Sequence, residues 1–146
     1  KVGLASPWHQ DQAYWCLTEP IGCTIWIALD HCDETNGGLT YIPGSQRYGL
    51  LRHVPSYAPG SSQKLDMESA RHAFGFHAPM RMVTPELAPG DALVHHCLTA
   101  HSSAPNTSDC PRRGITLQYV GENVGVNPTW LRLYEESLAR QLEART

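Results

Sequence analysis

The chain has 146 residues, of which 41% are hydrophobic and 17% are charged, and its formal net charge is −3. These values are typical of one folded domain and exclude a disordered chain. The small negative net charge leaves no basic surplus for binding phosphates, so nucleic acid is not expected as a partner. No apolar run approaches the roughly 18 residues that a membrane-spanning helix needs, so no membrane partner is expected either.

Short strands are predicted along most of the chain, because its 12 glycines and 11 prolines fall between short apolar runs. The predicted strands span residues 2–9, 22–30, 38–43, 79–84, 91–97, 99–102 and 113–120. Many short strands joined by turns indicate a mainly β fold.

The strand predicted at 22–30 has two different faces. Thr24 and Trp26 point to one side, and the residues that alternate with them point to the other side and are all apolar or cysteine. The first face therefore suits a pocket and the second suits a covering layer. The strand at 113–120 alternates in a similar way, and its small and polar face is in phase with Arg112.

Residues 55–78 are polar and glycine-rich and show no clear period. A loop of this length within a compact domain is usually functional or mobile. We therefore predict a lid or a mobile loop, and a plain surface loop is the alternative.

A C-terminal helix is predicted over residues 127–145. Asn127 suits the N-cap, and Pro128 suits the first turn. An apolar stripe at helical spacing would pack on the body of the domain or, alternatively, contact a second copy in a homodimer. The stripe consists of Leu131, Tyr134, Leu138 and Leu142.

The cysteines are odd in number and lack the CxxC spacing of a zinc ribbon. Unpaired thiols are typical of a reducing compartment, which predicts a cytoplasmic location. They are Cys16, Cys23, Cys32, Cys97 and Cys110.

The segment WHQD at residues 8–11 carries the first chemical signal. On an extended chain, residues two apart point the same way, so His9 and Asp11 are placed to bind one metal ion. A further histidine would complete a face of two histidines and one carboxylate. This face leaves open positions and is diagnostic of non-haem iron(II) oxygenases.

His101 is the best candidate for the second histidine, because an apolar strand precedes it and a polar turn follows it. His95 and His96 compete with it for this position. Arg112 follows His101 by eleven residues, and its guanidinium suits a bidentate pair with a ligand carboxylate. Its neighbour Arg113 is the second choice.

Three blocks of the sequence resemble the phytanoyl-CoA dioxygenase family of iron(II)- and 2-oxoglutarate-dependent oxygenases. The first is WHQD with the strand that ends IWIALD. The second is ETNGGLTYIPGSQRYG, and the third is PGDALVHHCLTAHSSAPNTSDCPRRGITLQY. The blocks cover most of residues 8–120. The resemblance implies a double-stranded β-helix, a jelly-roll and cupin-like barrel. Residues 1–146 would then form the C-terminal portion of a single oxygenase domain, with the usual N-terminal part missing.

The resemblance also implies roles for individual residues. His9, Asp11 and His101 match the iron ligands. Related halogenases lack the carboxylate, so Asp11 favours hydroxylation over halogenation.

The same resemblance implies a binding site for the co-substrate 2-oxoglutarate. Arg112 and Ser103 match the groups that hold its distal carboxylate, and Trp26 matches a tryptophan that lines the pocket. Ser102 replaces Ser103 if the register slips by one residue, and Trp26 is a plain core residue in the alternative interpretation.

The implied activity is hydroxylation of an unactivated C–H bond of a small-molecule substrate. O2 and 2-oxoglutarate are consumed, and succinate and CO2 are released. The alternatives are a cupin-like metal-binding protein that does not use 2-oxoglutarate and a catalytically incompetent binding module. We expect a monomer or a homodimer.

Overall fold

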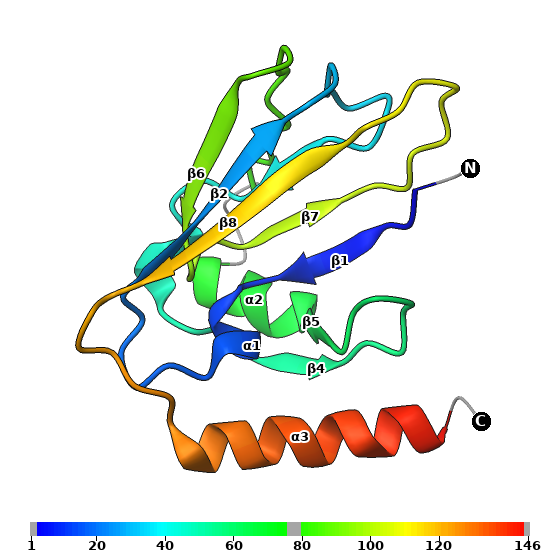
Figure 1. Ribbon diagram of the computed structural model, residues 1–146. Helices are drawn as coiled ribbons and strands as arrows, with labels where there is room; N and C mark the ends of the chain where they lie inside the picture. Colours follow the sequence, from blue (N-terminus) through cyan, green and yellow to red (C-terminus); the bar gives the residue numbers. More distant parts are fainter. Residues whose placement is uncertain (1–2, 76–79, 145–146) are drawn as a thin grey trace.

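Two three-stranded sheets face each other in the computed structural model, which describes residues 3–75 and 80–144 (Figure 1). One sheet has the order β1-β7-β3 and the other has the order β6-β2-β8. The strands of the first are β1 (Ser6–His9), β7 (His101–Ser103) and β3 (Leu39–Tyr41). Those of the second are β6 (Ala92–His96), β2 (Gly22–Ala28) and β8 (Gly114–Val120). This arrangement fits the predicted jelly-roll fold.

Strand β2 has the two faces that its sequence predicts. Thr24, Trp26 and Ala28 are buried, whereas the residues between them are half-buried. β2 pairs with β8 along its whole length, from Gly22 opposite Val120 to Ala28 opposite Gly114. The inward face of β2 therefore reaches the space between the sheets.

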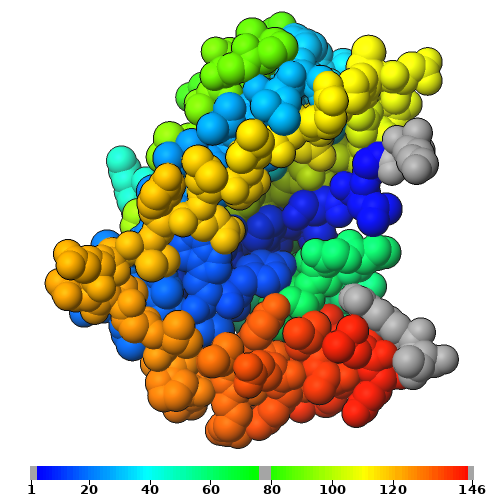
Figure 2. Space-filling view, viewed as in Figure 1, coloured from blue at the N-terminus to red at the C-terminus, as the bar shows by residue number. Residues whose placement is uncertain are grey.

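β8 is an edge strand, and all seven of its residues are exposed. In the space-filling view it runs along the surface of the molecule (Figure 2). Thr116 and Gln118 share this exposure although they lie on the inward face, opposite Trp26 and Thr24. Both faces of this strand are thus accessible.

The predicted strand at 79–84 does not form in the described part of the chain. Val83 instead makes an isolated bridge to Tyr41. Pro85 follows closely and has no N–H group with which to extend a ladder. Residue 79 lies outside the described residues.

Regular structure occupies much of the segment for which a loop was predicted. β4 (His53–Pro55) and β5 (Gln63–Leu65) form a hairpin, and α2 (Met67–Phe74) follows. Asp66 caps α2 by accepting a hydrogen bond from the backbone of Ser69. The prediction of a long loop is therefore wrong here, because Met67, Ala70 and Phe74 recur at helical spacing and pack on the core. A lid function stays a prediction, and residues 76–79 lie outside the described residues.

The C-terminal helix α3 (Pro128–Glu143) begins as predicted, with Asn127 accepting hydrogen bonds from two backbone N–H groups of the first turn. It lies beside β4 (Figure 1). Its fully buried residue is Gln141, which donates to the carbonyl of Ser62 over 2.8 Å. Leu142 is 52% exposed, so the predicted apolar stripe packs only in part. A dimer contact stays a prediction.

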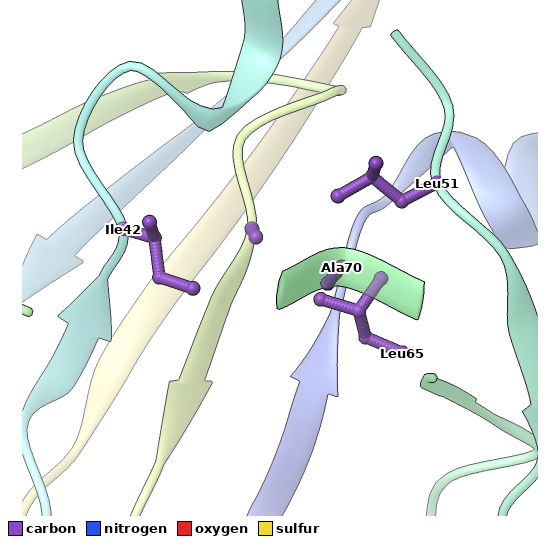
Figure 3. Packing of buried hydrophobic residues seen from close by; sticks show 5 residues of the cluster. Ile42, Leu51, Leu65 and Ala70 are labelled. Atoms are coloured by element: carbon purple, nitrogen blue, oxygen red, sulfur yellow. The ribbon is translucent and has the colours of Figure 1, made fainter. Parts of the chain in front are cut away.

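Two apolar clusters make the core. One joins the ends of β3 and β7 to β5 and α2, and the other lies under β2. The first contains Ile42, Leu51, Leu65, Ala70 and Ala100 (Figure 3). The second contains Trp26, Ala28, Cys32 and Leu87. Within the described ranges, no helix has the length and apolar character needed to cross a membrane.

Candidate metal centre

His9 and Asp11 meet where β1 gives way to α1 (Gln12–Trp15). His9 is the last residue of β1, whereas Asp11 has helical dihedral angles, with φ −58° and ψ −34°. The sequence predicted that both residues lie on one extended chain, and the structure shows that they do not. Nevertheless, Nε2 of His9 lies 3.6 Å from Oδ1 of Asp11. The turn from strand to helix brings the two side chains together.

His101 joins this pair from the neighbouring strand. It is the first residue of β7, and its Cα lies opposite that of His9. The two imidazole centroids are 4.2 Å apart, and Nε2 of His101 lies 3.7 Å from Oδ1 of Asp11. One ligand atom from each of the three residues lies within 4.8 Å of the others. These residues, here called the triad, are the three that the sequence predicted as ligands.

Both histidines of the triad present Nε2 to the carboxylate. Nδ1 of His9 lies 2.8 Å from the carbonyl of Pro7, and Nδ1 of His101 lies 2.9 Å from that of Thr99. A carbonyl only accepts, so each Nδ1 carries the proton and each Nε2 keeps a lone pair. Burial lowers the pKa of His101 to about 3. His101 is therefore neutral near pH 7, as a metal ligand must be.

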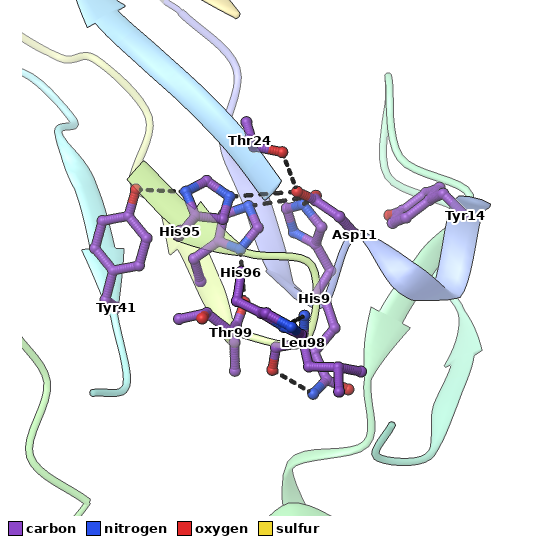
Figure 4. A network of polar contacts seen from close by, with 12 residues as sticks. His9, Asp11, Tyr14, Thr24, Tyr41, His95, His96, Leu98 and Thr99 are labelled. Carbon is purple, nitrogen blue, oxygen red and sulfur yellow. Dashed lines mark hydrogen bonds and ion pairs between the residues drawn. The ribbon is translucent and has the colours of Figure 1, made fainter. Parts of the chain in front are cut away.

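Asp11 is ionised at the same pH. Burial alone would raise the pKa of its carboxyl, but the neighbouring imidazoles of His9 and His95 outweigh burial and hold the pKa well below its usual range. Oδ2 accepts a hydrogen bond from the hydroxyl of Thr24 over 2.5 Å and lies 3.3 Å from Nε2 of His95 (Figure 4). Oδ1 therefore faces the two histidines of the triad, while Oδ2 contacts Thr24 and His95 on the opposite side.

Gln10 stands between the two ligands of the WHQD segment and is fully buried. Its amide nitrogen donates to the carbonyls of Leu98 and Gly49, over 2.7 and 2.9 Å. Its amide oxygen accepts from the backbone N–H of Leu51 over 2.8 Å. Because Leu98 lies just before β7, this side chain ties the chain near His9 to the segment that leads into His101.

The two neighbouring arginines have different surroundings. Arg113 forms a bidentate pair with Asp30, over 2.8 and 2.9 Å, and this pair lowers the pKa of Asp30 to about 2. Arg112 is half-buried, and its buried Nε has no hydrogen-bond partner among the residues that the structure describes. It borders a cavity of about 550 Å³ that residues 106–112 and Gly3 line. Arg112 is thus the arginine with an unsatisfied group.

Ser103 and Trp26 are both buried. Ser103 shares the buried face of β7 with His101, whereas Ser102 lies on the other face and is half-buried. The indole of Trp26 packs over Gly114, where a Cβ atom would come within 2.2 Å of the ring. This packing gives Trp26 a core role, and its pocket role stays a prediction. Across residues 3–75 and 80–144, no hydrogen bond or ion pair joins Arg112, Ser103 or Trp26 to the triad.

Thr24, Tyr41 and His95 surround the triad, and the sequence did not assign them to the site. His95 was weighed as a rival ligand, but it lies behind Asp11 and outside the triad, and His96 is exposed. The phenol of Tyr41 lies 3.1 Å from Nδ1 of His95 (Figure 4). One signal was available for Thr24, because it shares the inward face of β2 with Trp26.

Residues 1–114 match the sequence model of the phytanoyl-CoA dioxygenase (PhyH) family. An L-proline trans-4-hydroxylase of Streptomyces griseoviridis is 31% identical over 135 residues, which cover 80% of this chain and 48% of that protein.

Solved structures with a similar fold include EvdO2 and SnoN. EvdO2 of Micromonospora carbonacea var. aurantiaca, complexed with 2-oxoglutarate, is 29% identical, with a TM-score of 0.60 over 88% of this chain and 52% of EvdO2. The epimerase SnoN from nogalamycin biosynthesis, in complex with Fe3+, alpha ketoglutarate and nogalamycin RO, is 22% identical. Its TM-score is 0.69 over 92% of this chain and 49% of SnoN. The chain thus spans about half the length of these proteins.

Proposed function

The chain belongs to the phytanoyl-CoA dioxygenase family, and on this premise we propose that the protein is an iron(II)- and 2-oxoglutarate-dependent dioxygenase. It hydroxylates an unactivated C–H bond of a small organic substrate and releases succinate and CO2. The observation that carries this proposal is the triad, with two imidazoles and one ionised carboxylate converging between the sheets.

The donor set fits iron(II). Two Nε2 lone pairs and one carboxylate oxygen lie on the same side of the site, which is the facial arrangement that leaves further positions open. When bound, iron and 2-oxoglutarate supply the oxidising chemistry, with O2 as the oxidant. The chain contributes the fixed orientation of His9, His101 and Asp11. It also contributes the buried position of the site, which excludes water.

Arg112 fits the far carboxylate of 2-oxoglutarate. A buried guanidinium nitrogen without a partner is costly, and a bidentate carboxylate would satisfy it. Arg113 is already paired with Asp30, so Arg112 is the better candidate. In this proposal Ser103 adds a hydroxyl contact to the same carboxylate, and Trp26 forms a wall of the pocket.

Asp11 favours hydroxylation over halogenation, because its carboxylate occupies the position that a halide would need on the metal. The relative that carries out proline hydroxylation is consistent with this choice.

The competing function is that of a cupin-like metal-binding protein that is catalytically incompetent or does not use 2-oxoglutarate. The exposure of β8 on its inward face supports this alternative, because an enclosed co-substrate pocket would need cover there.

Anaerobic addition of iron(II) and 2-oxoglutarate separates the two functions. The proposed enzyme gives a visible charge-transfer band that needs both components, and substrate then stimulates succinate release in air. A folded protein that binds iron(II) without developing the band with 2-oxoglutarate would support the cupin-like alternative. A screen of small substrates by succinate release identifies what is hydroxylated.

A further inference from the structure

The two oxygens of Asp11 have different surroundings. Oδ1 faces Nε2 of His9 and of His101, at 3.6 and 3.7 Å. Oδ2 points away from them, toward the hydroxyl of Thr24 and Nε2 of His95 (Figure 4). The carboxylate therefore presents one oxygen to the proposed metal and gives the other to the protein.

Strand register explains why two groups reach Oδ2 together. Thr24 on β2 and His95 on β6 are direct partners in the same sheet, and both are buried on its inward face. Paired residues in neighbouring strands stand side by side. Thr24 and His95 therefore hold the carboxylate of Asp11 from one side.

The hydrogen-bond pattern fixes which nitrogen of His95 carries a proton. An ionised carboxylate only accepts hydrogen bonds, so Nε2 of His95 must donate to Oδ2 of Asp11. On the other side of the ring, Nδ1 of His95 lies 3.1 Å from the phenol oxygen of Tyr41. Tyr41 thus holds the ring of His95 in the orientation in which its Nε2 reaches Asp11.

Tyr41 is itself placed by the triad's strand. It lies on β3 opposite His101, and the two rings are stacked with centroids 5.8 Å apart. Its hydroxyl crosses to His95 on the facing sheet. Tyr41 therefore connects one ligand of the triad with the group that holds another.

We propose that His95, oriented by Tyr41, is a positioning residue that restricts Asp11 to binding the metal through Oδ1 alone. This inference rests on the proposed function. Without the bond from His95, Oδ2 is held by Thr24 alone, so it turns more easily toward the metal and binds as a second oxygen. That would fill one of the open positions that 2-oxoglutarate and O2 require. His95 itself is not a ligand, because its Nε2 is engaged by Oδ2.

The test compares His95→Phe with Tyr41→Phe, which keeps the ring stacked on His101 and removes only the hydroxyl. Iron(II) affinity, 2-oxoglutarate affinity of the iron-loaded protein and the position of the charge-transfer band are measured anaerobically. In His95→Phe, 2-oxoglutarate affinity falls by roughly 10- to 100-fold and the band shifts, while iron(II) affinity changes less. Tyr41→Phe shifts both in the same direction by a smaller factor.

Two further variants complete the design. His95→Gln, which keeps an N–H donor, recovers part of the loss, and the exposed His31→Phe changes none of the three measurements. If His95→Phe and Tyr41→Phe leave the band and both affinities unchanged, the inference is wrong. It is also wrong if His95→Phe removes iron(II) binding as fully as His101→Ala does, since His95 would then be a ligand. A wild-type protein that lacks iron(II) binding would overturn the proposed function itself, and this is measured before any variant.

Discussion

Asp11 and His101 are buried and His9 is half-buried between the two sheets, whereas Arg112 precedes an edge strand whose residues are all exposed. At the metal end, Oδ2 of Asp11 and each Nδ1 of the two histidines already have a hydrogen-bond partner within the chain. At the co-substrate end, the buried Nε of Arg112 has none among the described residues. The chain therefore preorganises the metal ligands and leaves the co-substrate group to be satisfied by what binds there.

Removing the carboxylate of Asp11 is expected to have the largest effect, because it breaks the preorganised end of the site. Asp11→Ala leaves two histidines and no anionic ligand, so iron(II) affinity falls by at least about a hundredfold and succinate formation stops. Calorimetric iron(II) titration and a succinate assay measure the two losses, and circular dichroism checks the fold. Turnover that persists in this variant would refute the ligand assignment.

Replacing Arg112 tests the open end. Arg112→Met removes a charged bidentate partner, so 2-oxoglutarate affinity falls by roughly 10- to 100-fold while iron(II) affinity is retained. Titration of the charge-transfer band measures both.

Arg113→Met is the matched control for the open end. It breaks the pair with Asp30 and leaves 2-oxoglutarate affinity unchanged. If Arg113→Met weakens 2-oxoglutarate affinity and Arg112→Met does not, Arg113 is the residue that binds the distal carboxylate.

Gln10 offers a way to loosen the preorganised end without touching a ligand. Gln10→Leu leaves the buried carbonyl of Leu98, the half-buried carbonyl of Gly49 and the buried N–H of Leu51 without their partner. We expect the free energy of unfolding to fall by about 2–4 kcal/mol. Urea unfolding measures the loss, and Gln118→Leu on exposed β8 is the control with little change. Equal stability of the two variants would show that the hydrogen bonds of Gln10 contribute nothing.

The sequence was sufficient to bring the triad together, but not to find what surrounds it. His9 and Asp11 are close in the chain, and the family resemblance, with the turn after His101, identified the third residue, which β7 holds opposite His9. His95 and Tyr41 meet only because β6 and β3 lie in sheets that face each other, and no local pattern in the chain encodes that pairing.

Helix α2 and strand β5 were missed for a different physical reason. α2 has only eight residues, with Met67, Ala70 and Phe74 at helical spacing, and β5 consists of three residues in a hairpin. Elements this short carry only a weak periodic signal, and their stability comes from tertiary contacts. Ala70 and Leu65, for example, pack against Ile42 and Leu51 in the first core cluster.

Protonation of His53 is expected to have the smallest effect, a loss of stability at mildly acidic pH near the metal end of the site. Burial, the main cause, lowers its pKa from 6.5 to about 4, and its Nε2 accepts the backbone N–H of Gln10 over 3.1 Å. The unfolded chain takes up a proton below pH 6.5, whereas the folded chain resists it down to about pH 4. Stability is therefore lost as the pH falls through this window, by about 1 kcal/mol between pH 6.5 and 5.5.

Urea unfolding of the metal-free protein across this range measures the loss. His53→Gln removes part of the slope, and the remainder belongs to His101, whose pKa is lowered in the same direction. If His53→Gln and wild type lose stability equally, protonation of His53 does not limit the fold, and the acid sensitivity lies in the triad itself.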